Sequence, residues 1–419
     1  LTAANTAAEN NHAAGVAFEK TVNGGAGGCS IYYAHNACAR YCRFAPVMMI
    51  AEVSFTVGTS MVDTINNRAM LIYNELYVES DKRMGERLNC GSADERSRWA
   101  MSPRDWYVRL PFYFSAASSR AFSLIACQFN TIRLGVTFVD PCSATSPLIE
   151  NWTDSNFITA MTYDDAAADP PADNISSKPL TALAPPTNVA RTGAASLSMF
   201  TYDVIVQYAY FGEAERASRI AETIEMLVVQ HQAMDNLERL TTSHTNFSTT
   251  LDFNFPVCSM VVTAQSGYRK AAGQAGDFRG FPDGATCSAD NFEGHPHHLL
   301  SDLQILFNNN VRQSSQEPGF YTALQPSLHA KCVPKENHLH LFSFGLGPSP
   351  YELIAGTANF SRLSTVKIGG NAATDAFLDH STLAAGVNKS EDSILIHCDV
   401  VSVNVGHFSA GQFSIHYAS

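Results

Sequence analysis

The sequence has few charged residues and no long apolar run, and both shortages restrict what the protein does. Charged residues make up 16% of 419 positions, with 27 Lys or Arg against 39 Asp or Glu and a formal net charge of −12. Because phosphate binding needs clustered basic residues, this balance argues against direct binding of nucleic acid. No apolar run approaches the roughly 20 residues that span a bilayer, and Leu1–Asn5 lacks the basic start of a signal peptide. We therefore expect a soluble, unprocessed chain.

The cysteines do not form a recognisable framework. His35, Cys38 and Cys42 come closest to the spacing of metal ligands, but the other half of a Cys/His set is not nearby. The dispersed spacing and the length of the chain favour reduced thiols in a cytosolic compartment over disulfides. The ten cysteines are Cys29, Cys38, Cys42, Cys90, Cys127, Cys142, Cys258, Cys287, Cys332 and Cys398.

The residues that are plentiful indicate an ordered protein with more than one core. Apolar residues make up 45% of the chain, and Phe and Tyr together account for 40 positions. Such a composition is typical of globular rather than disordered chains. At about 100–200 residues per domain, the length predicts two large domains. The low charge also suggests that much surface is buried against something, such as other copies of the chain.

The stretch Met199–Gln232 changes period near the middle of the chain, and we interpret it as the join between two all-β halves. Up to Phe211 the sequence alternates, which predicts a half-buried strand. After Gly212 the apolar residues recur at helical spacing, which predicts a helix over 213–232 that packs on its own domain. The expected strand face is Phe200, Tyr202, Val204, Val206, Tyr208 and Tyr210, and the expected helix stripe is Ala217, Ile220, Ala221, Ile224, Leu227 and Val228.

On both sides of this join the sequence predicts short strands, interrupted in each half by one long irregular excursion. The excursions are Asp140–Ala195, which is rich in Pro, and Gln265–Gln325, which is rich in Gly. Such long loops are usually functional surfaces or packing arms. The pattern predicts a sandwich or jelly roll in each half. Strands are expected at Ile50–Val57, Tyr107–Phe114, Thr131–Val139, Thr249–Ala264, His338–Leu346, Ser364–Ile368, Ile394–Val405 and Gln412–Tyr417, and a short helix at Arg68–Tyr77.

No group of residues predicts a catalytic, cofactor-binding or metal-binding site. The histidines at 295, 297 and 298 lie in a Gly/Pro loop, and His338 and His340 point the same way from one strand, so packed or solvated histidines are favoured over metal ligands. The phrase Gly356–Arg362 is better explained as a turn than as a ligand contact through Asn359 or Arg362. Neither a nucleophile elbow nor a phosphate loop is present. The sequence therefore predicts a protein that is not an enzyme.

Several phrases, met in order along the chain, resemble one protein family. They are Ala51–Phe55, Val62–Ile65, Tyr73–Leu76, Leu110–Ser115, Leu124–Asn130, Glu215-Arg216, Phe253–Val257, Pro334–Asn337 and Gly356–Arg362. This set resembles the major capsid proteins of nucleocytoplasmic large DNA viruses, the double jelly-roll group of iridoviruses and algal viruses. The sequence departs from the family at Phe255, where His is usual, and at Ile354-Ala355, where Pro-Ser is usual.

The resemblance implies an all-β fold of two tandem jelly rolls. The first would cover residues 1–212 with its N-terminal strands missing, a linker helix would cover 213–232, and the second jelly roll would cover 233–419. It also implies a homotrimer of pseudo-hexagonal outline that tiles an icosahedral virion shell and is assembled in the host cytoplasm. The two long excursions would form the outward tower of the capsomer.

The implied partners are other copies of the chain, neighbouring capsomers and minor capsid proteins. Nucleic acid is not contacted directly, and an inner membrane only indirectly. A carbohydrate-binding, lectin-like jelly-roll protein remains the alternative, because the same sandwich hosts lectins. A jelly-roll hydrolase would need paired carboxylates, and no sequence feature points to such a pair.

Overall fold

The computed structural model describes parts of both halves of the chain. Within this part, no helix is long and apolar enough to cross a membrane. The described residues are 42, 44–79, 106–116, 120–139, 202–267, 276, 278, 298–334, 338–373 and 393–416, together with short strands at 18–22, 29–33, 39–41, 149–151, 159–161 and 177–179.

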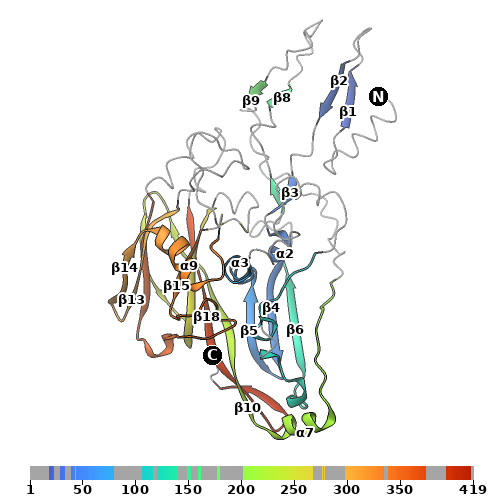
Figure 1. Cartoon of the computed structure of the whole chain (residues 1–419). Coiled ribbons are helices and arrows are strands. Elements are labelled where there is room, and N and C mark those ends of the chain that lie inside the picture. Colours follow the sequence, from blue (N-terminus) through green and yellow to red (C-terminus); the bar gives the residue numbers. More distant parts are fainter. Residues whose placement is uncertain are drawn as a thin grey trace.

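Three antiparallel sheets lie side by side and form the body of the molecule (Figure 1). The middle sheet has the strand order β10-β18-β12-β15, and two short strands extend it. Its members are β10 (Ile224–Leu240), β18 (Ile394–Ser409), β12 (Pro256–Ser266), β15 (Leu339–Ser343), β16 (Ala358–Asn359) on β12 and β19 (Gln412–Ile415) on β18.

The central strands of the middle sheet are buried on both faces. In β12, Met260 and Val262 pack into the core shared with the outer sheet, whereas Val261 points to the opposite face and packs against the first half. Because successive side chains of a strand alternate between faces, burial on both sides requires a continuous apolar run rather than an alternating one. The sequence around Met260–Val262 meets this requirement.

The outer sheet closes a sandwich with the middle sheet and corrects one prediction. Gln265–Gln325 was expected to be irregular, but its second part forms two paired strands. They are joined by Asn308 and Asn309, which both adopt positive φ, as a tight hairpin turn requires. This Asn-Asn turn between alternating apolar residues was a sequence signal for a hairpin. The sheet order is β11 (Asn246–Leu251), β17 (Val366–Ala372), β13 (Leu300–Phe307) and β14 (Asn310–Gln316).

The third sheet belongs to the first half of the chain and agrees with the sequence predictions at three elements. The strands β4 (Ile50–Val57) and β6 (Ile132–Phe138) and the helix α3 (Asn67–Leu76) confirm their expected positions. Strand β5 (Ser60–Asn66) pairs with β4, and the side chain of Asn66 caps α3 by accepting a hydrogen bond from Ala69 N at 2.7 Å. A four-residue helix, α2 (Ala45–Met48), precedes β4.

The prediction of a strand at Tyr107–Phe114 is wrong. Residues 106–112 belong to no sheet, and the helix α6 (Tyr113–Ala116) follows them. Pro111 lacks a backbone donor, and the neighbouring aromatic side chains pack into the core without a strand, as Phe112 does at 1% exposure. The 3₁₀ turn η2 (Leu124–Ala126) comes next.

The central stretch differs most from its prediction. Residues 202–212 belong to no sheet of the described part, and the helix α7 (Glu213–Ala221) ends eleven residues before the predicted position 232. From Ile224 onward the chain forms β10, which pairs with β18 along almost its whole length. The apolar spacing that suggested a helix also fits a strand, and the pairing decides between them. The exposed α7 was wrongly expected to pack in a core.

The remaining elements complete the second half. The single strand expected at Thr249–Ala264 is two strands, because the chain turns between β11 and β12 with Phe255 at φ 70°. The expected strands at His338–Leu346, Ser364–Ile368, Ile394–Val405 and Gln412–Tyr417 are confirmed as β15, β17, β18 and β19. Short helices lie at η3 (Phe320–Leu324), α9 (Gln325–His329) and η4 (Phe360–Arg362).

Six further short strands belong to none of the three sheets, and those labelled β1, β2, β8 and β9 lie at the upper end of Figure 1. They pair as three separate antiparallel ladders. Of the excursion Asp140–Ala195, only the strands in this group are described, and the rest lies outside the described residues. The pairs are β1 (Phe18–Val22) with β2 (Cys29–Tyr33), β3 (Ala39–Tyr41) with β7 (Ile149–Asn151), and β8 (Thr159–Met161) with β9 (Ser177–Pro179).

Candidate functional site

The junction between the two halves is the most elaborate polar and apolar contact among the described residues. Strand β5 of the first half packs against β10 of the second, and a single apolar core runs through both. Val53 and Ile65 of the first half share this core with Val228, Leu341 and Phe408 of the second. The two halves are therefore joined by buried surface and not only by the chain that links them.

Aromatic rings from the segment after α3 fill the lower part of this junction. Phe122 lies between the halves, with its ring centroid 5.3 Å from that of Phe408 and 5.5 Å from that of Phe413. Phe55 of β4 contacts Phe122 from the other side at 5.4 Å in an edge-on arrangement. Offset and edge-on aromatic pairs at these distances add to the stabilisation that burial alone provides.

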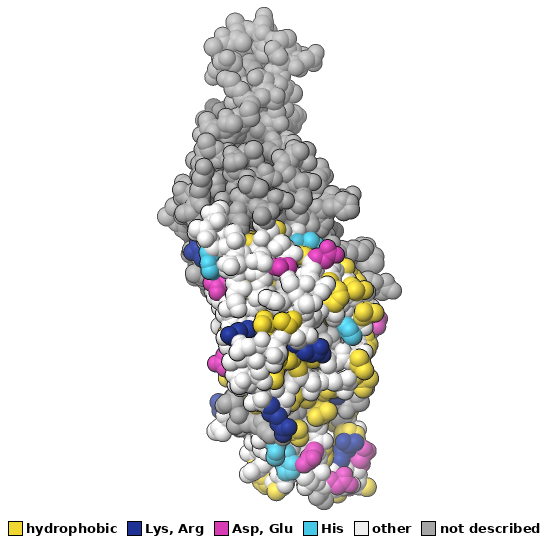
Figure 2. All heavy atoms as spheres, turned by 90° about the vertical axis from the view of Figure 1, so that its left-hand side faces the viewer, with side chains coloured by type: hydrophobic (Ala, Val, Ile, Leu, Met, Phe, Trp, Pro, Cys, Tyr) yellow, Lys and Arg dark blue, Asp and Glu magenta, His cyan; other side chains and the backbone are white. Residues whose placement is uncertain are grey.

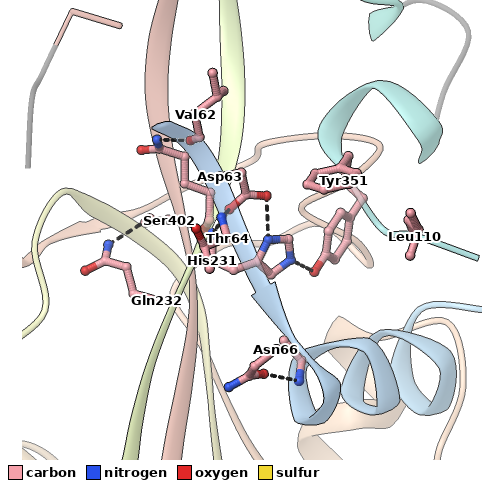
Figure 3. Close-up of polar contacts among 12 residues, drawn as sticks. Val62, Asp63, Thr64, Asn66, Leu110, His231, Gln232, Tyr351 and Ser402 are labelled. Atoms are coloured by element: carbon pink, nitrogen blue, oxygen red, sulfur yellow. Dashed lines mark hydrogen bonds and ion pairs between the residues drawn. The ribbon is translucent and has the colours of Figure 1, made fainter. Parts of the chain in front are cut away.

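A buried carboxylate, imidazole and hydroxyl form a chain across the junction (Figure 3). Asp63 of β5 accepts hydrogen bonds from the backbone N of His231 at 2.8 Å and from its Nδ1 at 2.9 Å. The Nε2 of the same ring lies 2.7 Å from the hydroxyl of Tyr351. Because a carboxylate only accepts, Nδ1 carries a proton, and Nε2 of a neutral ring then accepts from the tyrosine. This chain of hydrogen bonds links three segments that are far apart in the sequence.

The hydrogen-bonded Asp, His and Tyr resemble a catalytic relay in their residue types, but their surroundings favour a structural role. The side chains of Asp63 and His231 are 0% and 4% exposed. Burial, followed by the neighbouring Tyr77 and Tyr73, raises the pKa of Tyr351 well above its usual range, so its hydroxyl keeps its proton and remains a donor. The cavity that Tyr351 helps to line measures about 60 Å³, far below the roughly 300–1,000 Å³ of ligand pockets.

An ion-pair network joins α3 to the middle sheet a short distance away. Arg68 Nε and Nη2 both donate to the carboxylate of Asp399 on β18, the second at 3.0 Å, and Nη1 donates to Asp235 on β10. A bulge in β10 brings Asp235 to this position, because the ladder with β18 shifts register between Met234 and Glu238. Only the Arg68–Asp399 pair is buried on both sides, so loss of either partner would leave a buried charge without compensation.

The ionisation of the pair follows from burial and mutual attraction. Burial lowers the pKa of Arg68, but Asp399 and Asp235 more than reverse this effect, and the net pKa is raised. Burial also raises the pKa of Asp399, and the attraction of Arg68 opposes that rise. The guanidinium therefore stays charged, and the carboxylate depends on it for compensation.

Further hydrogen bonds tie the first half to strand β12 and to loops of the second half. The hydroxyl of Tyr77 donates to Ser259 Oγ at 3.1 Å, and burial raises the pKa of this tyrosine to about 12. The carbonyl of Leu76 accepts from the backbone N of Lys331 at 2.9 Å. Arg120 donates to the carbonyl oxygens of Pro350 and Glu352, and burial lowers its pKa. These contacts close the end of α3 against the second half.

The histidines of the two sequence groups meet in the structure. The ring of His298 lies 4.3 Å from that of His338 and 6.4 Å from that of His340, centroid to centroid. His338, just before β15, and His340, on β15, are both buried, so neither is solvated, and their interpretation as packed rather than metal-binding side chains stays a prediction. Among the described residues, no three His, Cys, Asp or Glu side chains are placed so that they could hold a metal ion. Residues 295 and 297 lie outside the described part.

The structure also describes some of the other residues that the sequence analysis singled out. Gly356 has φ +144°, a conformation that favours glycine, and lies against Gly345, while the interpretation of the whole phrase as a turn stays a prediction. Asn359 pairs with Pro256 in a two-residue ladder at φ −82°, not in the left-handed region. Cys42 is a buried free thiol, whereas His35 and Cys38 lie outside the described residues.

Sequence reasoning missed the residues that join the halves. Asp63 and Arg68 were noticed only as parts of a family phrase or a helix, and His231 was assigned to a helix that is in fact strand β10. Their partners lie far away in sequence, as with Arg68 and Asp399, which are 331 positions apart. The only available signal was their type, since polar residues within apolar strands usually have a partner when buried.

Comparison with known families gives two matches that follow one another along the chain. The profile described as large eukaryotic DNA virus major capsid protein matches residues 215–413, and the profile for the major capsid protein N-terminus matches residues 16–175. The chain belongs to the major capsid protein family of large eukaryotic DNA viruses. Comparison with curated protein sequences found no match.

Solved structures show the fold of this capsid protein. It is similar to a chain of the PBCV-1 virus capsid, a quasi-atomic model, with 17% identity and a TM-score of 0.64 over 91% of this chain and 87% of that one. It is also similar to PBCV-1 VP54, a crystal structure fitted into a cryo-EM reconstruction of the virophage Sputnik, with 16% identity and a TM-score of 0.58 over the same shares of each chain. The fold is a double jelly roll, mostly β with a few short helices.

Membership of this family gives the protein a structural role. A major capsid protein is a structural component of the virion and not an enzyme. In this protein the hydrogen bonds among Asp63, His231 and Tyr351 connect the two halves. The capsid role also implies that the protein associates with copies of itself.

Proposed function

We propose that this capsid protein forms homotrimers of pseudo-hexagonal outline, which tile an icosahedral virion shell after assembly in the host cytoplasm. The observation that carries the proposal is the core shared by the two halves, which makes one rigid block of two jelly rolls. If three such blocks surround one axis, and each block consists of two similar jelly rolls, then six similar units surround that axis. A flexible join between the halves would not keep that outline.

The division of the chain follows from the same observation. We place the first jelly roll at residues 1–212 and the link at α7, which replaces the expected linker helix over 213–232. The second jelly roll then begins with β10 at Ile224 rather than at 233, because β10 is a full member of the middle sheet.

The further partners of the shell are proposals of the same kind. Neighbouring capsomers and minor capsid proteins would bind the outer sides of the trimer, and an inner membrane would be reached only through them. The net charge of −12 supports a protein that does not contact the genome directly. The outward tower would come from 140–195 and the part of 265–325 that precedes β13.

Light scattering on a sizing column, followed by electron microscopy of the purified full chain, tests the proposal. We expect a mass of three chains, which is three times 45.4 kDa, and particles with a six-cornered outline. A chain that remains monomeric at every concentration, or that forms only dimers, would contradict the trimer. A glycan array on the same sample separates this function from carbohydrate binding.

A further inference from the structure

The segment 202–211 leaves an apolar strip exposed along one side of the protein. It runs beside β6 and down to α7, at the right-hand edge of Figure 1, and belongs to no sheet of the described residues. The Tyr202 ring lies 5.3 Å from that of Phe138 at the end of β6. Asp203 is the only charged residue in the segment.

Six large apolar side chains of this segment are exposed, and we call them the strand surface. Ile205 is 83% exposed and Tyr210 is 92% exposed, whereas side chains of this type are usually buried. If each of the six side chains buries on the order of 100 Å², together they bury roughly 600 Å². A stable interface buries ~800 Å² per partner, which is of similar size. The strand surface consists of Tyr202, Val204, Ile205, Val206, Tyr208 and Tyr210, with exposures from 49% to 92%.

A second group of exposed apolar side chains lies on the opposite side of the molecule, and we call it the helix surface. Its members are Val311 on the edge strand β14, Leu324 at the end of η3 and Leu328 on α9, which are 58%, 48% and 60% exposed. These elements are on the left of Figure 1, and Figure 2 shows hydrophobic side chains gathered on that face. One protomer therefore carries apolar surfaces on its two outer sides.

We propose that the strand surface of one copy binds the helix surface of a second copy. This inference rests on the proposed trimer and specifies which parts of it meet. A ring of three identical chains requires a contact between two different surfaces of each chain, because a contact between identical surfaces closes as a dimer. Surfaces on opposite sides of a protomer meet this condition. The contact joins the first half of one chain to the second half of the next.

Two variants of the full chain separate the surfaces. Ile205→Lys places a charge in the strand surface, and Leu328→Lys places one in the helix surface, each at a side chain more than half exposed. Analytical ultracentrifugation measures the protein concentration at which half of the chains are associated. We expect this concentration to be about tenfold or more higher for each variant than for the unchanged chain. Met61→Lys, at a side chain 61% exposed on β5 and in neither surface, is the matched control and should leave association unchanged.

Mixing the variants tests the pairing of the surfaces. A chain with Ile205→Lys retains its helix surface, and a chain with Leu328→Lys retains its strand surface, so an equal mixture should form dimers with one intact contact but no trimers. A chain that carries both substitutions should remain monomeric. Thermal unfolding of all variants should match the unchanged chain, since both positions are exposed.

The outcomes separate this inference from the proposed function. If the unchanged chain is a trimer and both variants remain trimers as stable as it, the proposed contact is wrong and the trimer stands. If the mixture forms no dimers although each single variant dissociates, the two surfaces do not bind each other. An unchanged chain that is monomeric at all concentrations overturns the trimer itself. Amide hydrogen exchange of residues 202–210 gives a reading without substitution, and the proposed contact requires slower exchange at high protein concentration.

Discussion

Arg68 at the start of α3 and Asp399 on β18 form a buried pair of hydrogen bonds between the two jelly rolls, and the bond from Nη2 to Oδ1 measures 3.0 Å. Both side chains are less than 10% exposed. The pair connects a helix of the first half to a central strand of the second. Its position makes the orientation of the two halves depend on one electrostatic contact as well as on the shared apolar core.

Replacing Arg68 by Leu should destabilise the protein severely. The carboxylate of Asp399 would remain buried without a compensating charge, which costs about 3–5 kcal/mol. Urea unfolding at pH 7, followed by circular dichroism, measures this loss. The double variant Arg68→Leu with Asp399→Leu removes both charges and should recover most of it. Equal losses in the single and double variants would show that the ion pair itself is not the cause.

Replacing Tyr351 by Phe should cost about 1–3 kcal/mol of unfolding free energy, because Nε2 of His231 loses its partner in a buried site. Tyr113→Phe is the matched control. Its hydroxyl is also buried and has no hydrogen-bond partner among the described residues, so its removal should be neutral or slightly stabilising. Similar losses for both variants would show that ring packing rather than the hydrogen bond is responsible.

Acid should destabilise the fold through His340. Burial, followed by the neighbouring His298, lowers the pKa of His340 from 6.5 to about 3. Between these two values the unfolded chain binds a proton that the folded chain does not, so stability is complete above pH 6.5 and falls as the pH decreases toward 3. The expected slope is about 1.4 kcal/mol per pH unit.

The variant His340→Phe tests this slope. Urea unfolding at several values between pH 7.5 and 4.5 should show a dependence on pH that is shallower by about one proton. Phe342→Leu, a buried and uncharged position on the same strand, is the control and should lower stability equally at every pH. An unchanged slope in His340→Phe would contradict the assignment to this histidine.

The hairpin turn between β13 and β14 should depend on one asparagine side chain. Asn308 Oδ1 accepts hydrogen bonds from the backbone N of Ser364 at 2.9 Å, from its hydroxyl at 2.7 Å and from the backbone N of Thr365 at 3.2 Å. Asn308→Gly keeps the positive φ but loses these bonds, at an expected cost of about 1–2 kcal/mol. Asn308→Asp keeps an acceptor and should retain more stability in thermal unfolding. If both variants unfold together, the backbone conformation alone is decisive.

Sequence by itself determined which parts of the chain prefer extended structure and to which family it belongs. The alternation of Ile50–Val57, the apolar run at Met260–Val262 and the period of α3 are local properties, and each appears where it was predicted. Local steric preference and side-chain periodicity produce these signals without regard to distant residues. The double jelly roll followed from ordered phrases that resemble the family.

Only the tertiary structure decided how these elements pair and which polar residues meet. Residues 224–232 are compatible with either helix or strand, and pairing with β18 selects the strand. Residues 202–211 have the pattern of a strand, yet no strand of the described part pairs with them. Asp63 with His231, and Arg68 with Asp399, become partners only when the halves pack. Burial then makes their hydrogen bonds necessary, and no local pattern encodes a contact between residues more than 150 positions apart.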